Sequence, residues 1–347
     1  MAARGIAPGL KPADALTVVA ILAESSDAPV AKIANETLGK LPAPLLQGAL
    51  GPELPAGVID VIALSYLGDL GTMERILTLP QIAPETVVQI AARCNEATAE
   101  IVATNEERLL AHPAIIEKLY LNKHTRMSTA NRALELAVRN KIVIEGIPAY
   151  EEAALALANE LIPEPTPEPT FGDVIFKEAT EIGAQLAAEA VQADTHDFDE
   201  ESGEEKLKGK FMPVHARISE MSMAEKIRTA MVGSASERAI LVRDSNKTVA
   251  RAAVKSPQIQ ENEAVRISAM RNVSDDVLSE IARSPKWKSS YQIKLNLVQN
   301  PRTPMHIATK LIPYLFEHDV KAIAKSKNVT GPIATAAKQQ LQRKGKH

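Results

Sequence analysis

The sequence predicts an all-α protein, an α-solenoid of short helical hairpins that repeat at intervals of about 28 residues, in two arrays joined by a linker. Three kinds of position recur at this one interval, and periods of about 20–50 residues are typical of stacked-repeat proteins. They are a polar set (Asp244, Asn272, Asn300, Asn328), a proline set (Pro257, Pro285, Pro313) and apolar sets (Ala239, Ile267, Leu295, Ile323; Val249, Val277, Met305, Ile333).

Residues 263–285 illustrate one predicted hairpin. Residues 264–270 carry apolar side chains at helical spacing, and so do residues 277–281. Between them Asn272 and Ser274 favour a turn and a helix N-cap, and Pro285 forbids continuation of the second helix. Two such short helices cannot bury their own apolar faces, so we expect each hairpin to stack on its neighbours.

A looser version of the pattern is found earlier in the chain. Pro55, Pro84 and Pro113 are evenly spaced at almost the same period, and the helix-breaking residues Gly68, Asn95 and Asn122 follow them, again evenly spaced. We therefore expect an acidic N-terminal array over residues 12–161 and a basic C-terminal array over residues 212–347. Residues 162–211 are expected to hold a proline-rich spacer (163–170), an amphipathic helix (171–191) and an acidic, disordered loop (194–205).

The composition narrows the class of protein further. Aromatic residues are only 3% of the chain, which suits short helices packed through Ala, Leu, Ile and Val. Neither a signal-peptide core nor an apolar run long enough to span a bilayer is present, so we expect no membrane insertion. The single cysteine, Cys94, excludes an intramolecular disulfide framework and indicates a reducing, cytoplasmic location. Cys94 itself is expected to be a small buried residue.

These features resemble a known kind of repeat protein. Residues 240–246 (Ile-Leu-Val-Arg-Asp-Ser-Asn) and 271–274 (Arg-Asn-Val-Ser) are similar to turn motifs of bacterial helical-repeat proteins. Together with the period, they resemble bacterial HEAT-like repeats and, more closely, leucine-rich-repeat-variant units, over most of the chain outside about 163–211. The resemblance implies scaffolding and partner binding, with some nucleic-acid-processing members, and it carries no catalytic residue. The Asp/Arg ladder typical of HEAT units is missing, so the resemblance concerns architecture only.

No catalytic, metal-binding or cofactor-binding signature is found in the sequence. The seven histidines show no zinc-ligand spacing, and phosphate-binding and nucleophile motifs are lacking. The adjacent carboxylates Glu151-Glu152 and Asp275-Asp276 are interpreted as helix openings, where negative charge is favourable. We therefore expect no enzyme activity, no cofactor and no metal, although scattered residues can also assemble a site in a groove.

Charge is distributed unevenly along the chain. Residues 1–205 hold 14 Lys and Arg against 32 Asp and Glu, whereas residues 206–347 hold 26 against 11. Basic residues of the second half recur at equivalent positions, so stacked repeats would align them in ladders with rungs about 10 Å apart. The candidate residues for binding an anionic partner are Arg238, Arg266 and Lys294; Arg243, Arg271 and Lys327; and Lys255 and Arg283.

Two functions follow from these observations, and a third interpretation needs no function. The leading hypothesis is a non-enzymatic adaptor that binds protein partners through extended surfaces, with the acidic loop 194–205 masking the basic array. The alternative is nucleic-acid binding by residues 212–347 through phosphates, although few aromatic residues are available for stacking on bases. The ladders are equally explained as a solvated face that keeps the array soluble.

Overall fold

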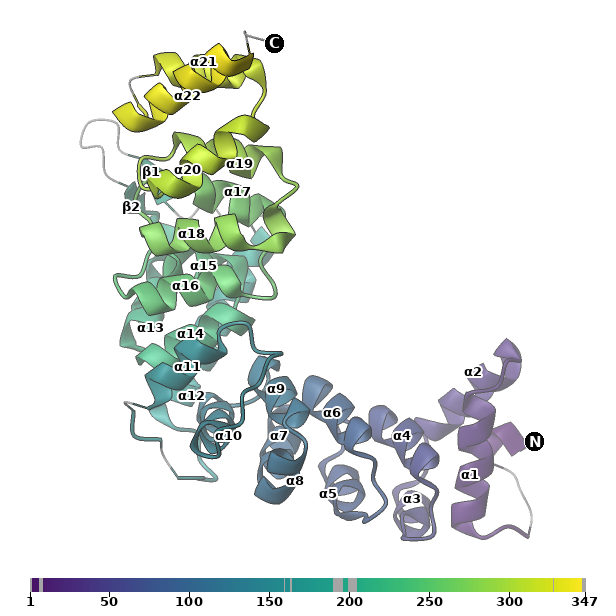
Figure 1. The fold of residues 1–347 in the computed structure, drawn as a ribbon. Helices are drawn as coiled ribbons and strands as arrows, with labels where there is room; N and C mark the ends of the chain where they lie inside the picture. Colours follow the sequence, from purple (N-terminus) through teal and green to yellow (C-terminus); the bar gives the residue numbers. More distant parts are fainter. Residues whose placement is uncertain are drawn as a thin grey trace. The chain divides into compact units, whose positions relative to one another are not determined.

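The protein is built of helices, as the sequence predicts. The computed structural model describes residues 2–5, 9–158, 160–162, 164–189, 196–198, 205–326 and 328–344, and these residues form helices and one short pair of strands (Figure 1). Contacts divide the chain into two compact units, residues 1–147 with 162–167, and residues 148–161 with 168–347. None of the described helices is both long and apolar enough to cross a membrane.

The first unit contains the 3-10 helix η1 (Ala2–Arg4) and ten α-helices. These are α1 (Pro12–Ala23), α2 (Ala28–Leu38), α3 (Ala43–Ala49), α4 (Ala56–Ser65), α5 (Leu70–Thr78), α6 (Pro84–Arg93), α7 (Glu96–Ala103), α8 (Glu106–Ala111), α9 (Ala114–Leu121) and α10 (Met127–Arg139). In the middle of the unit α6 packs between α4 and α9, while α7 packs between α5 and α10. Fully buried Ile59, Ile62, Ile76 and Ile90 form part of the core that these helices share.

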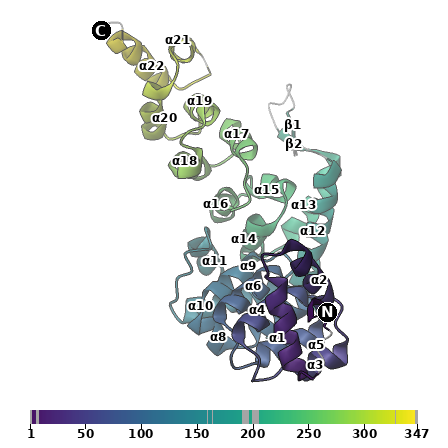
Figure 2. The same cartoon turned by 90° about the vertical axis from the view of Figure 1, so that its right-hand side faces the viewer.

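The second unit begins with α11 (Tyr150–Leu157) and α12 (Phe171–Glu189) and continues to the end of the chain. Its other elements are β1 (His196–Phe198), β2 (Glu205–Leu207), η2 (Gly209–Phe211), α13 (Met212–Glu220), α14 (Met223–Val232), α15 (Ala235–Leu241), α16 (Lys247–Lys255), α17 (Glu261–Ala269), α18 (Asp275–Arg283), η3 (Pro285–Trp287), α19 (Tyr291–Gln299), α20 (Met305–Leu311), η4 (Ile312–Tyr314), α21 (Glu317–Lys325) and α22 (Gly331–Lys344). Helix α16 packs between α14 and α18, and α17 packs on α19 (Figure 2).

The boundaries of the units differ from those expected at residues 161 and 211. Helix α11 packs on α14 and α16, and α12 packs on α13 and α15, so both belong to the second unit. Arg228 of α14 is fully buried, with its guanidinium 4.8 Å from the ring centroid of Phe176 on α12. The amphipathic helix expected in the linker is therefore a packed part of the second unit.

The proline-rich segment and the acidic loop also differ from simple linkers. In the segment 163–170, Thr166 and Pro167 accept hydrogen bonds through their carbonyl oxygens from Nη1 of Arg126, at 3.3 Å each, so this part is attached to the first unit. Within 194–205, the described residues His196–Phe198 form β1 and Glu205 begins β2, and the two strands pair antiparallel rather than forming a disordered loop. The remainder of that loop lies outside the described residues.

Positions separated by one repeat period lie at equivalent places in the second unit. Pro257, Pro285 and Pro313 each lie two residues beyond the end of α16, α18 and α20. Asp244, Asn272 and Asn328 each lie three residues beyond the end of α15, α17 and α21. Asn300 lies nearer to its helix, directly after α19, and its side chain is buried, whereas those of Asn272 and Asn328 are exposed. Asp244, Asn272 and Asn328 thus share a place relative to the preceding helix, whereas Asn300 differs from Asn272 and Asn328 in both that place and its burial.

Asn122 and Asn300 connect neighbouring helix pairs by the same hydrogen bonds in the two units. Each follows the first helix of its own pair, and its Nδ2 donates to two carbonyl oxygens at the C-terminal end of the corresponding helix one pair earlier. Nδ2 of Asn122 lies 3.0 Å from the oxygens of Ala91 and Cys94. Nδ2 of Asn300 lies 2.9 Å from the oxygen of Ser268 and 2.7 Å from that of Met270. Oδ1 accepts from the backbone nitrogen two residues on, at 2.9 and 3.0 Å.

Replacing Asn300 therefore removes a buried link between pairs. We expect Asn300→Ala to lower the free energy of unfolding by about 1–3 kcal/mol, since carbonyl oxygens at the end of α17 lose their donors in a buried place. Asn272→Ala, at the matched but exposed position, is expected to change it by less than about 0.5 kcal/mol. Urea unfolding of both variants measures the difference, and equal effects would contradict the bridging role.

Candidate functional site

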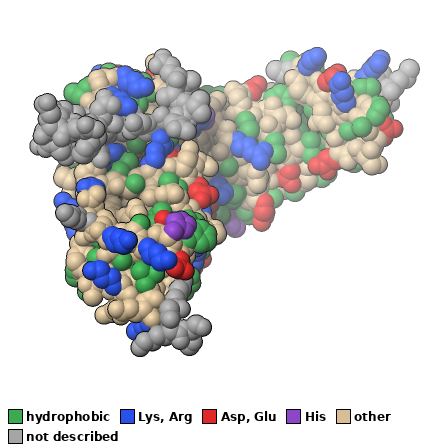
Figure 3. All heavy atoms as spheres, turned by 90° about the horizontal axis from the view of Figure 1, so that it is seen from above, with side chains coloured by type: hydrophobic (Ala, Val, Ile, Leu, Met, Phe, Trp, Pro, Cys, Tyr) green, Lys and Arg blue, Asp and Glu red, His purple; other side chains and the backbone are tan. Residues whose placement is uncertain are grey.

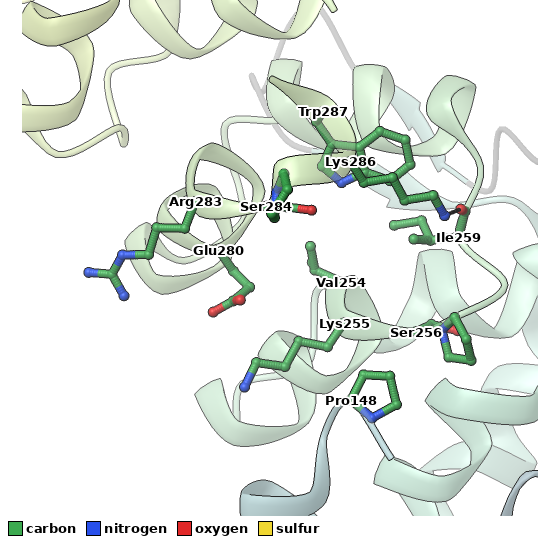
Figure 4. Close-up of a pocket in the computed structure, with 12 residues that line it drawn as sticks. Pro148, Val254, Lys255, Ser256, Ile259, Glu280, Arg283, Ser284, Lys286 and Trp287 are labelled. Carbon is green, nitrogen blue, oxygen red and sulfur yellow. Dashed lines mark hydrogen bonds between the residues drawn. The ribbon is translucent and has the colours of Figure 1, made fainter. Parts of the chain in front are cut away.

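A cavity of about 530 Å³ lies where α16 and α18 end, and it brings two of the predicted binding residues together. Lys255 and Arg283 are the last residues of these two helices, and both line the cavity (Figure 4). The prolines that stop the helices, Pro257 and Pro285, also line it. Because each proline forces the chain to leave the helix, the cavity is formed by two equivalent helix ends and the loops that follow them.

The charged groups of this cavity are only partly free. Nζ of Lys255 donates to Oε1 of Glu152 at 2.7 Å, and Nη2 of Arg251 lies 2.9 Å from the same oxygen. Glu152 is buried in the first turn of α11. Besides its expected place at the start of the helix, it therefore binds two cations of α16. These two ion pairs connect α11 to α16, and the one with Lys255 neutralises part of its positive charge.

Arg283 is the cation that this cavity exposes most directly. Its side chain is exposed and has no ionic partner within 4.0 Å among the residues that the structure describes. In Figure 4 the side chains of Lys255, Glu280 and Arg283 point to the same side of the cavity. This arrangement offers positive charge to a ligand carboxylate or phosphate, with Glu280 limiting the net charge.

Lys286 and Trp287, which also line the cavity, were not among the predicted site residues. Nζ of Lys286 donates to the carbonyl oxygen of Ile259 at 2.6 Å and lies 4.7 Å from the ring centroid of Trp287. Trp287 is buried and forms part of the wall. A sequence signal was present, because Trp287 is the chain's single tryptophan and lies one repeat period after the buried Ile259.

The predicted ladder of Arg238, Arg266 and Lys294 is not a row of equivalent exposed cations. Arg238 is buried, and its Nε and Nη2 donate to the two carboxylate oxygens of Glu263 at 3.0 and 2.9 Å. Nη1 of Arg238 donates to the carbonyl oxygen of Gly233 at 2.6 Å. Arg266 and Lys294 are half-buried. The expectation for Arg238 as a surface residue is therefore wrong, because its guanidinium is used inside the unit.

The ladder of Arg243, Arg271 and Lys327 is also uneven. Nη1 of Arg243 donates to the carbonyl oxygen of Ala239 at 2.8 Å, so it serves the end of its own helix. Arg271 is exposed in the turn before α18. Lys327 lies outside the described residues. In Figure 3 the basic side chains of the face shown lie in small groups among hydrophobic and acidic ones.

Other basic residues of the second unit are paired with carboxylates. Nζ of Lys247 lies 3.2 Å from Oδ1 of Asp275 and 3.0 Å from Oδ2 of Asp276, and Nζ of Lys226 lies 3.2 Å from Oδ2 of Asp244. The carboxylates Asp275 and Asp276 do open α18, as expected from the sequence. The excess of basic residues in this half is thus partly used in contacts between helices.

The described residues contain no group of three or more His, Cys, Asp or Glu side chains that could hold a metal ion. Cys94 is buried, as predicted, and burial raises the pKa of its thiol to about 11. A neutral thiol is a poor nucleophile. The α16–α18 cavity, by contrast, has Lys255, Arg283 and Lys286 in its lining, which suits an anion.

Glu237 is the most perturbed carboxyl group outside the cavity among the described residues. Burial raises its pKa to about 7, while the Ser234 hydrogen bonds and the charge of Arg238 act in the opposite direction. Helix α12 packs closely over Glu237 because residue 183 is a glycine: a Cβ at Gly183 would lie 2.7 Å from Oε2 of Glu237. Oε2 accepts from the backbone nitrogen of Ser234 at 2.6 Å, which completes a capping box on α15.

The two arginines of the first ladder are expected to differ in stability measurements. Arg238→Ala leaves Glu263 buried without its partner and is expected to lower the free energy of unfolding by about 3–5 kcal/mol. Arg266→Ala, at the same position one helix pair later, is expected to cost less than about 0.5 kcal/mol. Urea unfolding of each variant decides this, and a small effect at Arg238 would show that the buried pair contributes little.

Glu237 is expected to make stability depend on pH. Since its pKa is about 7 in the folded chain against an ordinary 4.5, the folded state binds the extra proton between these values. The free energy of unfolding therefore falls as pH rises from 4.5 through 7, by at most about 1.4 kcal/mol per pH unit from this group. Glu237→Gln should flatten the change of Tm between pH 5 and 8, whereas exposed Glu261→Gln should not. An unchanged profile for Glu237→Gln would exclude this role.

Comparison of the chain with protein-family models, with curated protein sequences and with solved structures gives no match.

Proposed function

We propose that this chain is a non-enzymatic scaffold of HEAT-like, α-solenoid type that binds protein partners through surfaces that successive helix pairs repeat. The observation that carries the proposal is the equivalence of positions separated by one repeat period, which places Lys255 and Arg283 at matching helix ends in one cavity. A stack of equivalent pairs presents an extended surface, which is how solenoid proteins bind their partners.

The mixture of charges on the second unit favours a protein partner over nucleic acid. Binding along a phosphate backbone relies on many cations that are free to replace counterions. Here Arg238, Lys247 and Lys255 are each engaged with carboxylates of the same unit. The basic residues that are not paired in this way lie among acidic and apolar side chains. A protein surface, with charges of both signs and apolar groups, is the better complement to such a mixture.

We also propose that residues 194–205 reduce the access of partners to basic residues of the second unit outside the α16–α18 cavity, since seven of these twelve residues are acidic. A reducing, cytoplasmic location is part of the same proposal. It is supported by the single, buried cysteine, which needs no oxidising compartment.

The proposal is tested by cross-linking partners to the full chain and identifying them by mass spectrometry. A variant with four alanines replaces cations of the predicted ladders, Arg266, Arg271, Arg283 and Lys294. We expect it to lose the cross-linked proteins, because these cations contact them. The matched control replaces four basic residues elsewhere on the unit, Arg302, Lys310, Lys321 and Lys325, and should retain them. A variant that lacks residues 194–205 should capture more of the same proteins.

Equal capture by both alanine variants would contradict a role for these cations. Fluorescence anisotropy with a duplex DNA and a single-stranded RNA tests the alternative. Tight binding that weakens steeply with salt, and that is lost only in the first variant, would replace the scaffold proposal with nucleic-acid binding.

A further inference from the structure

We propose that the cavity at the ends of α16 and α18 and a second cavity beside it form one groove for an acidic peptide of a partner protein, anchored by a single large apolar side chain. This inference rests on the proposed function and names the chemistry of the partner. We call the first cavity the charged slot and the second the apolar slot. Trp287 lines both of them.

The apolar slot, of about 340 Å³, is the counterpart of the charged slot one helix pair later. Four of its lining residues lie one repeat period after residues that line the charged slot. Ala282, Trp287, Leu311 and Tyr314 correspond in this way to Val254, Ile259, Arg283 and Lys286. The two slots are therefore the same feature of the fold, formed twice in succession.

The chemistry of the two slots differs although their backbone origin is the same. Leu311 and Tyr314 in the apolar slot stand where Arg283 and Lys286 stand in the charged slot. Further apolar side chains cover its floor, and its cations are Lys288 and Lys294. The floor residues are Ile281, Ile293 and Leu297, all of them buried.

Charge identifies the ligand as an anion. The charged slot is lined by three cations, of which Lys255 is paired with Glu152, and by the one carboxylate of Glu280; the apolar slot is lined by two cations and no carboxylate among the described residues. Lys286 is held by the carbonyl oxygen of Ile259 and the ring of Trp287, so its ammonium group is fixed in place. A cation held in one position favours a ligand whose carboxylates are spaced to meet it.

The apolar slot identifies the ligand as a peptide rather than a nucleic acid. A phosphate backbone has no apolar group to place against Ile293 and Leu297, whereas a leucine or phenylalanine side chain does. Tyr314 is 69% exposed at the edge of this slot, and it would be covered by such a ligand. Interface anchors of this kind are large apolar or aromatic side chains surrounded by polar contacts.

Residues 194–205 of the chain supply a probe with the required chemistry, because Phe198 lies between Asp197 and Asp199 in an otherwise acidic segment. In Figure 2 the strand pair that contains Phe198 lies on the side of α15 and α17, away from α16 and α18. We therefore assign the groove to a partner in trans and use this segment only as a synthetic peptide.

The test measures binding of a labelled peptide of sequence 194–205 to the full chain by fluorescence anisotropy. We expect saturable binding that weakens at least about tenfold when the peptide's phenylalanine is replaced by alanine, or when its carboxylates are replaced by amides. Arg283→Glu and Tyr314→Asp in the protein should each weaken binding by a similar factor. Lys310→Glu, an exposed neighbour outside both slots, should lower it by no more than twofold. Circular dichroism and Tm confirm that each variant is folded.

Three results would overturn the inference. The first is no binding of the peptide to the full chain. The second is an affinity that is unchanged when the peptide's phenylalanine is replaced, and the third is an affinity that is unchanged by Arg283→Glu and Tyr314→Asp. Binding that appears only after Phe198→Ala in the protein would instead show that the chain's own segment fills the groove. Partner capture that depends on the four ladder cations, without peptide binding, would leave the scaffold proposal standing and refute only this groove.

Discussion

The structure depends on apolar contact between neighbouring helix pairs, because two helices of about ten residues cannot enclose a core between themselves. In the first unit α6 is covered by α4 and α9, and in the second α16 is covered by α14 and α18. Ile90 and Val249, one from each of these middle helices, are fully buried. Each pair is therefore stabilised by its neighbours, and in the second unit equivalent helix ends recur from one pair to the next while their side chains differ.

Burial between pairs also determines which polar groups are available at the surface. Backbone carbonyl oxygens at helix ends need donors, and Asn122 and Asn300 provide them across the gap between pairs. Charged side chains are buried where an oppositely charged partner is also buried, as Arg238 is beside Glu263. Those without such a partner remain at the surface, and Arg283 is the clearest case among the described residues.

The two slots beside Trp287 show that equivalent backbone positions can present different side-chain chemistry at the surface. The helix ends at Arg283 and Leu311 are equivalent in the backbone, yet one residue is charged and the other apolar. Both helix ends are followed by a 3-10 helix, η3 or η4, while the two cavities differ in volume and in the chemistry of their lining. Equivalent helix ends can therefore differ in chemistry from one pair to the next.

The sequence by itself determined the helical class, the helix boundaries marked by prolines and Asx residues, and the burial of Cys94, since these follow from local periodicity and backbone chemistry. It also placed Lys255 and Arg283 at equivalent positions. Only the tertiary structure decided that Arg238 is paired inside with Glu263 and that α11 and α12 belong to the second unit. The physical reason is that charge pairing and burial depend on neighbours distant in sequence, such as Glu152 beside Lys255, which no repeat period reveals.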